Sequence, residues 1–261
     1  MTEPLFDRLP EVAREIGGAS HFLLCLDFDG TLAPIVPCPE DSRMPARTRA
    51  VLERLVSQPG TTVAIVSGRA CENLRSRVGL DVILAGNHGL EIMLGNTHWR
   101  HPTAVKSQPA LHEMCAELSA LAAEIPGAFI EDKGLTASLH YRNAAAVIVP
   151  RLSEIVNAVI APHKDLFLLR HGKKVFEVLP SVPWDKGSAV LCILERLRAK
   201  QGPDISVCYI GDDATDECAF RKLTGAITVR VGESRHTSAR FRVAGTEEVA
   251  EFLDRLSGGT A

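Results

Sequence analysis

The apolar run Phe22–Leu26 is followed directly by Asp27, Phe28, Asp29 and Gly30, and this junction constrains the fold more than any other stretch. A short, unbroken apolar run is typical of a strand buried on both faces of a parallel sheet. Open α/β sheets bind ligands at the carboxyl ends of their strands, which is where both carboxylates lie. Neither aspartate has a Lys or Arg nearby in sequence, so a polyvalent cation is the partner that most readily offsets their desolvation.

Later apolar runs repeat the strand pattern, with helical patterns between several of them. The expected strands are 61–66, 82–85, 205–210 and 226–231, and the expected helices are 47–56 and 187–199. Polar or glycine-rich residues follow several of these strands at their carboxyl ends. Strands that alternate with helices predict an α/β fold with a Rossmann-like parallel sheet and right-handed crossovers.

The middle of the chain has a different pattern, with two hairpin-like strand pairs and two helices. The expected pairs are 129–133 with 136–142 and 166–171 with 174–179, and the helices are near 106–125 and 145–160. This order predicts a small α+β domain inserted into the larger one. We therefore expect a core domain of residues 1–104 and 180–261, and an inserted cap domain of residues 105–179.

The composition excludes several classes of function. The chain has 261 residues, of which 46% are hydrophobic and 23% charged, and its net charge of −3 gives no basic field for nucleic acid or anionic membrane. No apolar run approaches the roughly 18 residues of a membrane span, and the first residues lack a signal-peptide core. The seven cysteines form no C-x-x-C pair, which suits reduced thiols. We expect a cytoplasmic protein, monomeric, with a small-molecule substrate.

Asp27 and Asp29 have the chemistry of a phosphoryl-transfer pair. Asp27 is placed to attack phosphorus and form an aspartyl-phosphate, and Asp29 to protonate the leaving oxygen and then activate water. On an extended strand their i, i+2 spacing puts both side chains on the same side. Gly30 permits close backbone approach, and Thr31 offers a hydroxyl. The alternative is a simple strand-terminal turn, since Asp-Gly is a common turn pair.

Three further positions supply matching chemistry. The acidic run Gly211–Glu217 follows a buried strand; helix-dipole complementarity explains Asp216 and Glu217 but poorly explains Asp212. With Asp27 it makes an all-oxygen site that suits Mg²⁺. Ser67 can donate to a phosphate or cap a helix. Lys186 opposes the dipole at the start of a helix, so we expect its charge to balance Asp27 and phosphate, although a solvated lysine is the alternative.

These four pieces, in this order, resemble the motifs of the haloacid dehalogenase (HAD) superfamily of phosphohydrolases. The resemblance implies catalytic roles for Asp27, Asp29, Ser67 and Lys186. It also implies Mg²⁺ held by Asp27, the Asp29 carbonyl and Asp212, with Asp216 in support. Family ATPases have threonine at the position of Asp29, so an aspartate there indicates phosphatase or phosphomutase chemistry.

Longer segments resemble the trehalose-6-phosphate phosphatase family over about residues 22–235. They include Leu26–Ile35, Val66–Arg69, Asn87–Glu91, Lys133-Gly134, His140–Arg142, Gly172-Lys173 with Glu177, Lys186-Gly187 and Gly211–Glu217. The resemblance implies a mobile cap that closes over a phosphorylated disaccharide and excludes water. The implied substrate-binding residues are Gly30, Thr31, Arg69, Asn87, His88, Glu131, Lys133, His140, Arg142, Lys173 and Glu177. One departure is Leu179, where members often have a basic residue, and this weakens the exact assignment of cap contacts.

The sequence thus predicts a Mg²⁺-dependent phosphatase that releases trehalose and phosphate, in the stand-alone form without a glucosyltransferase module. The main alternative is a HAD phosphatase for another sugar phosphate, such as sucrose phosphate. A phosphomutase and a non-catalytic sugar-phosphate sensor are further alternatives, the last disfavoured because every catalytic position is intact.

Overall fold

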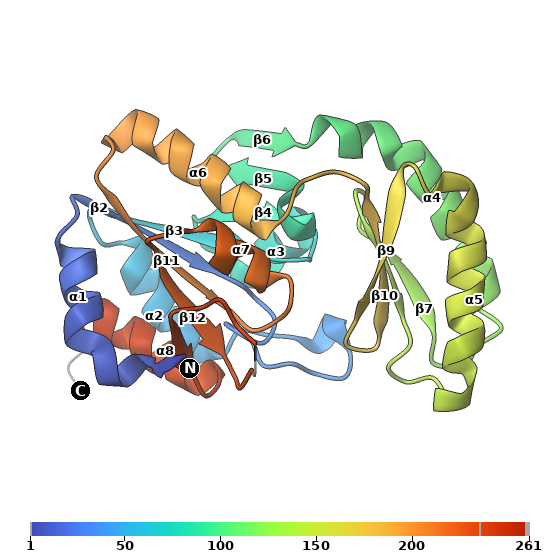
Figure 1. Cartoon of the computed structure of the whole chain (residues 1–261), viewed down its shortest axis with the longest axis horizontal. Coiled ribbons are helices and arrows are strands. Elements are labelled where there is room, and N and C mark those ends of the chain that lie inside the picture. Colours follow the sequence, from blue (N-terminus) through green and yellow to red (C-terminus); the bar gives the residue numbers. More distant parts are fainter. Residues whose placement is uncertain (1, 235, 259–261) are drawn as a thin grey trace. The chain divides into compact units, whose positions relative to one another are not determined.

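The computed structural model describes residues 2–234 and 236–258 of the chain. They form two compact units: the larger comprises the chain up to Trp99 and from Trp184 onward, and the smaller is Arg100–Pro183 (Figure 1). The junctions expected from the sequence, near 104 and 180, lie a few residues inside these positions. Each unit has its own sheet and its own hydrophobic core.

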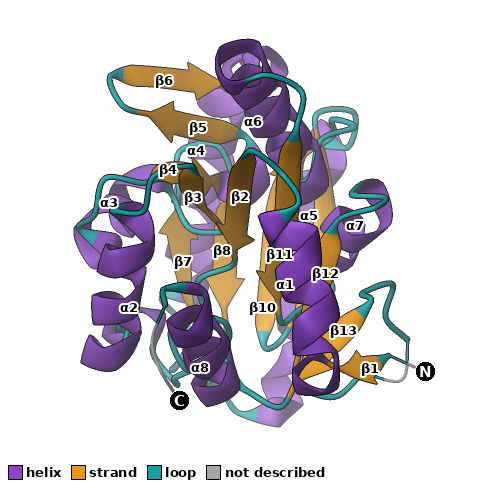
Figure 2. Ribbon diagram, turned by 90° about the vertical axis from the view of Figure 1, so that its left-hand side faces the viewer, coloured by secondary structure: helices purple, strands orange, loops and turns teal. Residues whose placement is uncertain are grey.

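The sheet of the larger unit has β2 in its interior, and Figure 2 shows this strand between β3 and β11. Its strands, in spatial order, are β1 (Glu3–Pro4), β13 (Phe241–Val243), β12 (Ile227–Val231), β11 (Ile205–Gly211), β2 (His21–Leu26), β3 (Thr61–Val66), β4 (Ile83–Gly86), β5 (Glu91–Leu94) and β6 (Thr97–Arg100). Neighbours from β1 to β4 run parallel, whereas β5 is antiparallel to β4. The four later strands expected from the sequence are therefore confirmed, within a residue at each end.

Helices cover both faces of this sheet, as the unbroken apolar strands require. The helices of the larger unit are α1 (Leu9–Gly17), α2 (Ala46–Val56), α3 (Cys71–Val78), α6 (Lys186–Gln201), α7 (Asp216–Lys222) and α8 (Thr246–Leu256), with 3-10 turns η1 (Leu5–Arg8), η2 (Pro39–Asp41) and η3 (Asn87–Gly89). Leu24 and Leu26 of β2 pack in the core shared with α2, α3 and α8. Leu23 and Cys25 pack in the core shared with α6 and α7. This alternation directs the next odd-numbered residue, Asp27, toward α6.

The smaller unit is an antiparallel sheet with helices packed on one face. Its strands, in spatial order, are β7 (Phe129–Asp132), β8 (Ala137–His140), β10 (Val175–Pro180) and β9 (Phe167–Gly172), and its helices are α4 (Pro102–Ala122), α5 (Val149–Ile160), η4 (Ala146–Ile148) and η5 (Ala161–His163). Ile130, Leu139 and Phe176 pack with α4 and α5 in one core. Because side chains alternate along a strand, Glu131, His140 and Glu177 lie on the opposite face.

No helix within residues 2–234 and 236–258 combines the length and the apolar character needed to cross a membrane.

Candidate active site

Four loops of the larger unit bring the predicted catalytic residues to one edge of the sheet. Asp27 follows β2, Ser67 follows β3, and Asp212 follows β11. The turn η3 follows β4 and contains His88. Because these strands are parallel neighbours, their carboxyl ends meet at the same edge, as the sequence predicts.

Lys186 joins two carboxylates at the centre of this edge. Its ammonium donates to Asp27 Oδ1 and to Asp216 Oδ1, each at 2.8 Å, and its side chain is only 3% exposed. Asp185 caps α6 by accepting a 2.9 Å hydrogen bond from the backbone N–H of Ser188, which fixes where the helix begins. Burial alone lowers the pKa of Lys186, but the charges of Asp216 and Asp27 outweigh it and hold that pKa well above its usual value. Lys186 is therefore a permanent cation between two acids.

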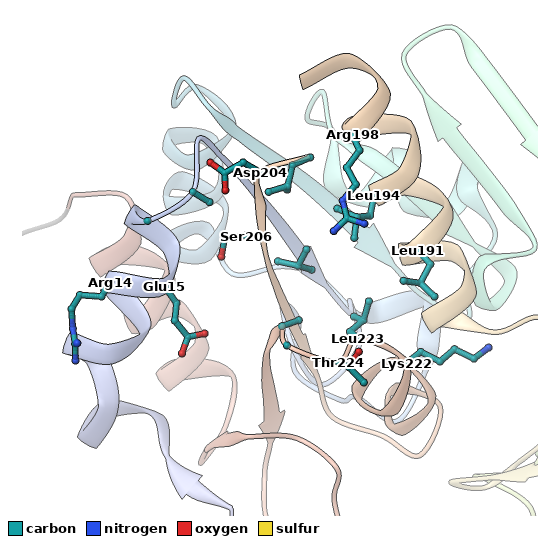
Figure 3. A pocket seen from close by; sticks show the side chains of 16 residues that line it. Arg14, Glu15, Leu191, Leu194, Arg198, Asp204, Ser206, Lys222, Leu223 and Thr224 are labelled. Carbon is teal, nitrogen blue, oxygen red and sulfur yellow. The ribbon is translucent and has the colours of Figure 1, made fainter. Parts of the chain in front are cut away.

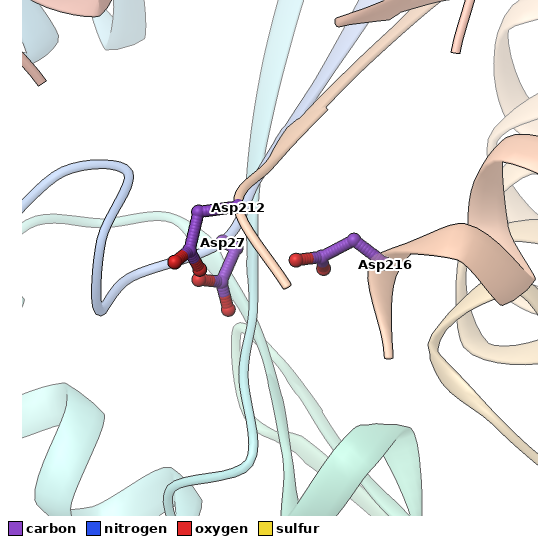
Figure 4. Close-up of side chains that lie close together, drawn as sticks. All are labelled: Asp27, Asp212 and Asp216. Carbon is purple, nitrogen blue, oxygen red and sulfur yellow. The ribbon is translucent and has the colours of Figure 1, made fainter. Parts of the chain in front are cut away.

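One oxygen each from Asp27, Asp212 and Asp216 lies within 4.8 Å of the others, and all three residues are buried (Figure 4). Three carboxylates against one ammonium leave an excess of negative charge in a buried site, and an all-oxygen donor set suits Mg²⁺. The residues thus fit a divalent cation. Asp27 and Asp212 are the better direct ligands, since the oxygens of Asp216 already accept several hydrogen bonds from the protein.

Asp216 organises the cluster through Tyr209, a residue that the sequence did not single out. The Tyr209 hydroxyl donates to Asp216 Oδ1 at 2.7 Å, and the backbone N–H of Asp213 donates to Asp216 Oδ2 at 3.0 Å. Burial and the nearby carboxylates raise the pKa of Tyr209 well above its usual value, so its hydroxyl remains a donor. Its only signal in the sequence is a phenol within an otherwise apolar run, which resembles ordinary core.

The charge on Asp27 depends on its neighbours. Burial raises the pKa of the Asp27 carboxyl, the Lys186 ammonium opposes this, and Asp216 and Asp212 raise it further. A divalent cation bound beside Asp27 and Asp212 would favour the ionised form, which is the form that a nucleophile needs.

Glycine brings the Asp27 loop against Asp212. Gly30 has φ +87°, and a Cβ built there would lie 2.4 Å from Asp212 Cγ. Only glycine satisfies both the backbone conformation and the contact. This close approach is the role expected for Gly30. The neighbouring Thr31 is fully buried, and its hydroxyl has no hydrogen-bond partner among the described residues.

Asp29 has partners different from those of Asp27. Strand β2 ends at Leu26 and a turn begins at Phe28, so the extended-strand spacing does not carry through to Asp29. Arg69 donates to both oxygens of Asp29, and the Ser42 hydroxyl donates to Oδ1. Ser67 is 2% exposed, and its Oγ accepts a 3.3 Å hydrogen bond from the Arg69 backbone N–H.

Buried hydrogen bonds to neighbouring residues stabilise the turn after β4. Asn87 and His88 have φ values of +51° and +58°, a left-handed conformation that is uncommon outside glycine. The fully buried Asn87 donates its amide to Glu91 Oε1 at 2.8 Å, and the same oxygen accepts the Cys71 backbone N–H at 2.7 Å. The His88 ring lies against Gly68, where a Cβ would be 2.7 Å from it. His88 thus borders the Ser67 loop, while Asn87 supports the turn.

The predicted sugar-binding residues of the smaller unit gather on its helix-free sheet face and adjoining turns. His140 Nε2 lies 2.8 Å from Glu131 Oε2, and Lys133 Nζ lies 3.9 Å from the same oxygen. Phe129, which the sequence did not single out, stacks on the His140 ring with centroids 4.7 Å apart. Arg142 donates to the Lys173 carbonyl at 2.8 Å. Glu177 is paired in register with Ser138 and Arg170.

A hollow of about 650 Å³ lies at the opposite end of β11 from Gly211, and its residues include Arg14, Arg198 and Asp204 (Figure 3). None of the predicted site residues lines it. The predicted site residues therefore lie away from this hollow, some of them at the carboxyl edge of the larger unit's sheet and the others in the smaller unit.

The sequence of this chain is similar to the sequences of one protein family over most of its length. The model of the trehalose-phosphatase family matches residues 25–247. A trehalose-phosphate phosphatase of Mycobacterium ulcerans (strain Agy99) is 36% identical over 238 residues, which cover 88% of this chain and 60% of the relative. The present chain thus spans only 60% of the length of that relative.

Solved structures show the same architecture. The crystal structure of a trehalose-6-phosphate phosphatase related protein matches with a TM-score of 0.80 and 26% identity, covering 90% of this chain and 97% of that one. A haloacid dehalogenase-like hydrolase from Bacteroides thetaiotaomicron matches with a TM-score of 0.63 and 16% identity, covering 90% and 99%, and this likeness concerns the fold alone. The α/β fold class predicted from the sequence is confirmed.

Proposed function

This chain belongs to the trehalose-phosphatase family, and we propose that it is a Mg²⁺-dependent phosphatase that hydrolyses trehalose 6-phosphate to trehalose and phosphate. The observation that carries the proposal is the buried Lys186 bridge between Asp27 and Asp216, with Asp212 in the same cluster. A structural ion pair does not need three acids and one base at the ligand-binding edge of a sheet. A nucleophile, a cation site and charge compensation for a phosphate do need them.

In the first step, Asp27 Oδ attacks phosphorus and the bond from phosphorus to the sugar oxygen breaks. The leaving group is a sugar alkoxide, which is a poor leaving group, so Asp29 donates a proton to it as trehalose departs. In the second step, Asp29 takes a proton from water, whose oxygen attacks phosphorus and releases Asp27. A bound Mg²⁺, held by Asp27 and Asp212, would supply a positive charge that lowers the repulsion between carboxylate and phosphate.

We assign two other side chains, Ser67 and Lys186, to the phosphate. The Ser67 oxygen accepts from the Arg69 backbone N–H, which leaves its O–H free to donate to a phosphate oxygen. Lys186 compensates the charge on Asp27 before and during the attack. For the disaccharide, we assign Glu131, Lys133, His140, Arg142, Lys173 and Glu177 to the sugar hydroxyls.

The direct test of this function is phosphate release from a panel of sugar phosphates in Mg²⁺, with and without EDTA. We expect trehalose 6-phosphate to have the highest kcat/KM, EDTA to abolish release, and excess Mg²⁺ to restore it. Similar kcat/KM for several unrelated sugar phosphates, sucrose phosphate included, would favour the broader phosphatase. Binding without phosphate release would indicate a sensor.

A substitution on the smaller unit tests the sugar assignment. Glu131→Gln keeps the shape of the side chain but removes the charge that faces His140 and Lys133. Hydrogen bonds to charged groups contribute about 1.5–3 kcal/mol, so we expect KM for trehalose 6-phosphate to rise about tenfold or more. Turnover of p-nitrophenyl phosphate, which has no sugar, should change little. The matched control is Glu117→Gln on α4, which packs on the opposite face of the sheet. Equal effects of both substitutions on both substrates would contradict the assignment.

We also propose a monomeric, cytoplasmic enzyme. All seven cysteines are free thiols, which suits a reducing compartment. Size-exclusion chromatography with light scattering tests the oligomeric state.

A further inference from the structure

We propose that Arg69 and Ser42 are positioning residues that hold the Asp29 carboxylate for its acid and base steps; this role rests on the proposed function. The sequence resemblance assigns Arg69 to substrate binding and assigns nothing to Ser42. The hydrogen bonds of both side chains lead instead to Asp29.

Arg69 donates two hydrogen bonds to the Asp29 carboxylate. Its Nε donates to Asp29 Oδ2 at 2.5 Å and its Nη2 to Asp29 Oδ1 at 2.8 Å, and the arginine is buried. This forked arrangement fixes the plane of a carboxylate, which a single contact cannot do. Asn73 of α3 accepts from Arg69 Nη1 at 3.1 Å, and the guanidinium lies over the Phe28 ring at 5.6 Å, so the arginine is itself held in place.

Ser42 adds a third donor from a separate segment. Its hydroxyl donates to Asp29 Oδ1 at 2.8 Å, and the residue is 1% exposed. Arg69 Nη2 also donates to the Pro39 carbonyl at 2.8 Å, which ties the segment Pro39–Ser42 to the same arginine. Burying a hydroxyl costs free energy unless it forms a hydrogen bond. Packing alone therefore does not explain a buried serine in this irregular segment, whereas its hydrogen bond to the Asp29 carboxylate does.

The distribution of these bonds identifies the reactive oxygen. Each carboxylate oxygen has about two lone-pair positions. Oδ1 accepts from Arg69 and Ser42, so both positions are filled, whereas Oδ2 accepts only from Arg69 within the described part of the chain. Oδ2 is therefore the atom that gives the proton to the sugar oxygen and later takes one from water.

The test uses two substrates that differ in their need for an acid. The sugar alkoxide must be protonated to leave, whereas p-nitrophenolate leaves without a proton; both phosphoenzymes need Asp29 as base. For Arg69→Met we expect kcat/KM on trehalose 6-phosphate to fall about a hundredfold. On p-nitrophenyl phosphate, kcat/KM should fall much less, with a burst of one p-nitrophenolate per enzyme and then a slow steady rate.

Ser42→Ala should show the same pattern more weakly. Ser42→Thr keeps the hydroxyl, so its kcat/KM on both substrates should match that of the wild type.

Arg240→Met is the matched control. Arg240 also makes a forked ion pair, with Glu15, through Nη1 to Oε2 at 2.8 Å and Nη2 to Oε1 at 2.6 Å, and it lies over the Phe241 ring, but it makes no hydrogen bond to Asp29, Ser42 or Asn73. A substitution that only disturbs the fold should lower kcat/KM equally for both substrates and should give no burst of p-nitrophenolate. This expectation holds for either arginine variant. Equal losses on both substrates in Arg69→Met, or a rise in KM alone as expected for a phosphate ligand, would overturn the positioning role. A wild-type protein that hydrolyses neither ester would overturn the proposed function, and this role with it.

Discussion

Asp27→Asn is expected to lower phosphate release from trehalose 6-phosphate by at least about a thousandfold, because an amide cannot form the phosphoenzyme. The substitution is nearly isosteric, and the asparagine oxygen can still accept from the Lys186 ammonium. The fold should therefore persist, which the thermal midpoint of the variant will show. Steady-state phosphate release at saturating Mg²⁺ is the measurement.

The control for this substitution is Asp204→Asn. Asp204 lies just before β11, at the end opposite Gly211, where it accepts a 2.8 Å hydrogen bond from the Ser20 backbone N–H. It makes no hydrogen bond to the proposed catalytic residues, so phosphate release should stay within about twofold of wild type. Full activity of the Asp27→Asn protein would mean that another group attacks phosphorus.

Lys186→Met is expected to lower the free energy of unfolding by about 3–5 kcal/mol, which is the usual effect of leaving buried charges without their partner. The variant removes the only positive charge bonded to Asp27 and Asp216 among the described residues, while Asp212 stays close by. Urea unfolding in EDTA measures this effect. Saturating Mg²⁺ should recover part of the lost stability, since a ligand that binds only the folded state stabilises it.

Lys222→Met is the matched control for the stability measurement. Lys222 pairs with Asp185 at 2.9 Å, but its side chain is 39% exposed, and exposed ion pairs contribute about 0–1 kcal/mol. Equal losses of stability for Lys186→Met and Lys222→Met, or a loss that Mg²⁺ leaves unchanged, would contradict a buried cation-binding cluster around Lys186.

The sheet and the meeting of Asp27, Lys186 and Asp212 at its edge could be predicted because their signals are local. Apolar runs such as Phe22–Leu26 are long enough to identify buried strands, and parallel strands place the residues that follow them at one edge. Lys186 at the start of a helix is unfavourable for the dipole, and the structure gives the reason in its two carboxylate partners.

The remaining parts of the site depend on contacts between distant segments, which the sequence does not encode locally. Ser42 lies in an irregular segment with no periodicity, and its bond to Asp29 forms only when that segment folds back. In the sequence, Tyr209 resembles any other core residue of β11, and only the structure shows that its hydroxyl donates a hydrogen bond to Asp216. The turn at Asp27–Gly30 separates the partners of Asp27 and Asp29, although strand spacing predicts a common side. Short acidic motifs therefore predict the chemistry better than they predict the contacts.

The most direct measurement is to identify the residue that carries the phosphoryl group in the Asp29→Ala protein after mixing with p-nitrophenyl phosphate and Mg²⁺. This variant lacks the base for the second step, so the phosphoenzyme should accumulate. We expect one p-nitrophenolate per enzyme, and peptide mass spectrometry should find the phosphoryl group on Asp27, in a form that hydroxylamine removes. A phosphoryl group on any other residue, or steady turnover with no burst and no phosphoenzyme, would contradict the mechanism.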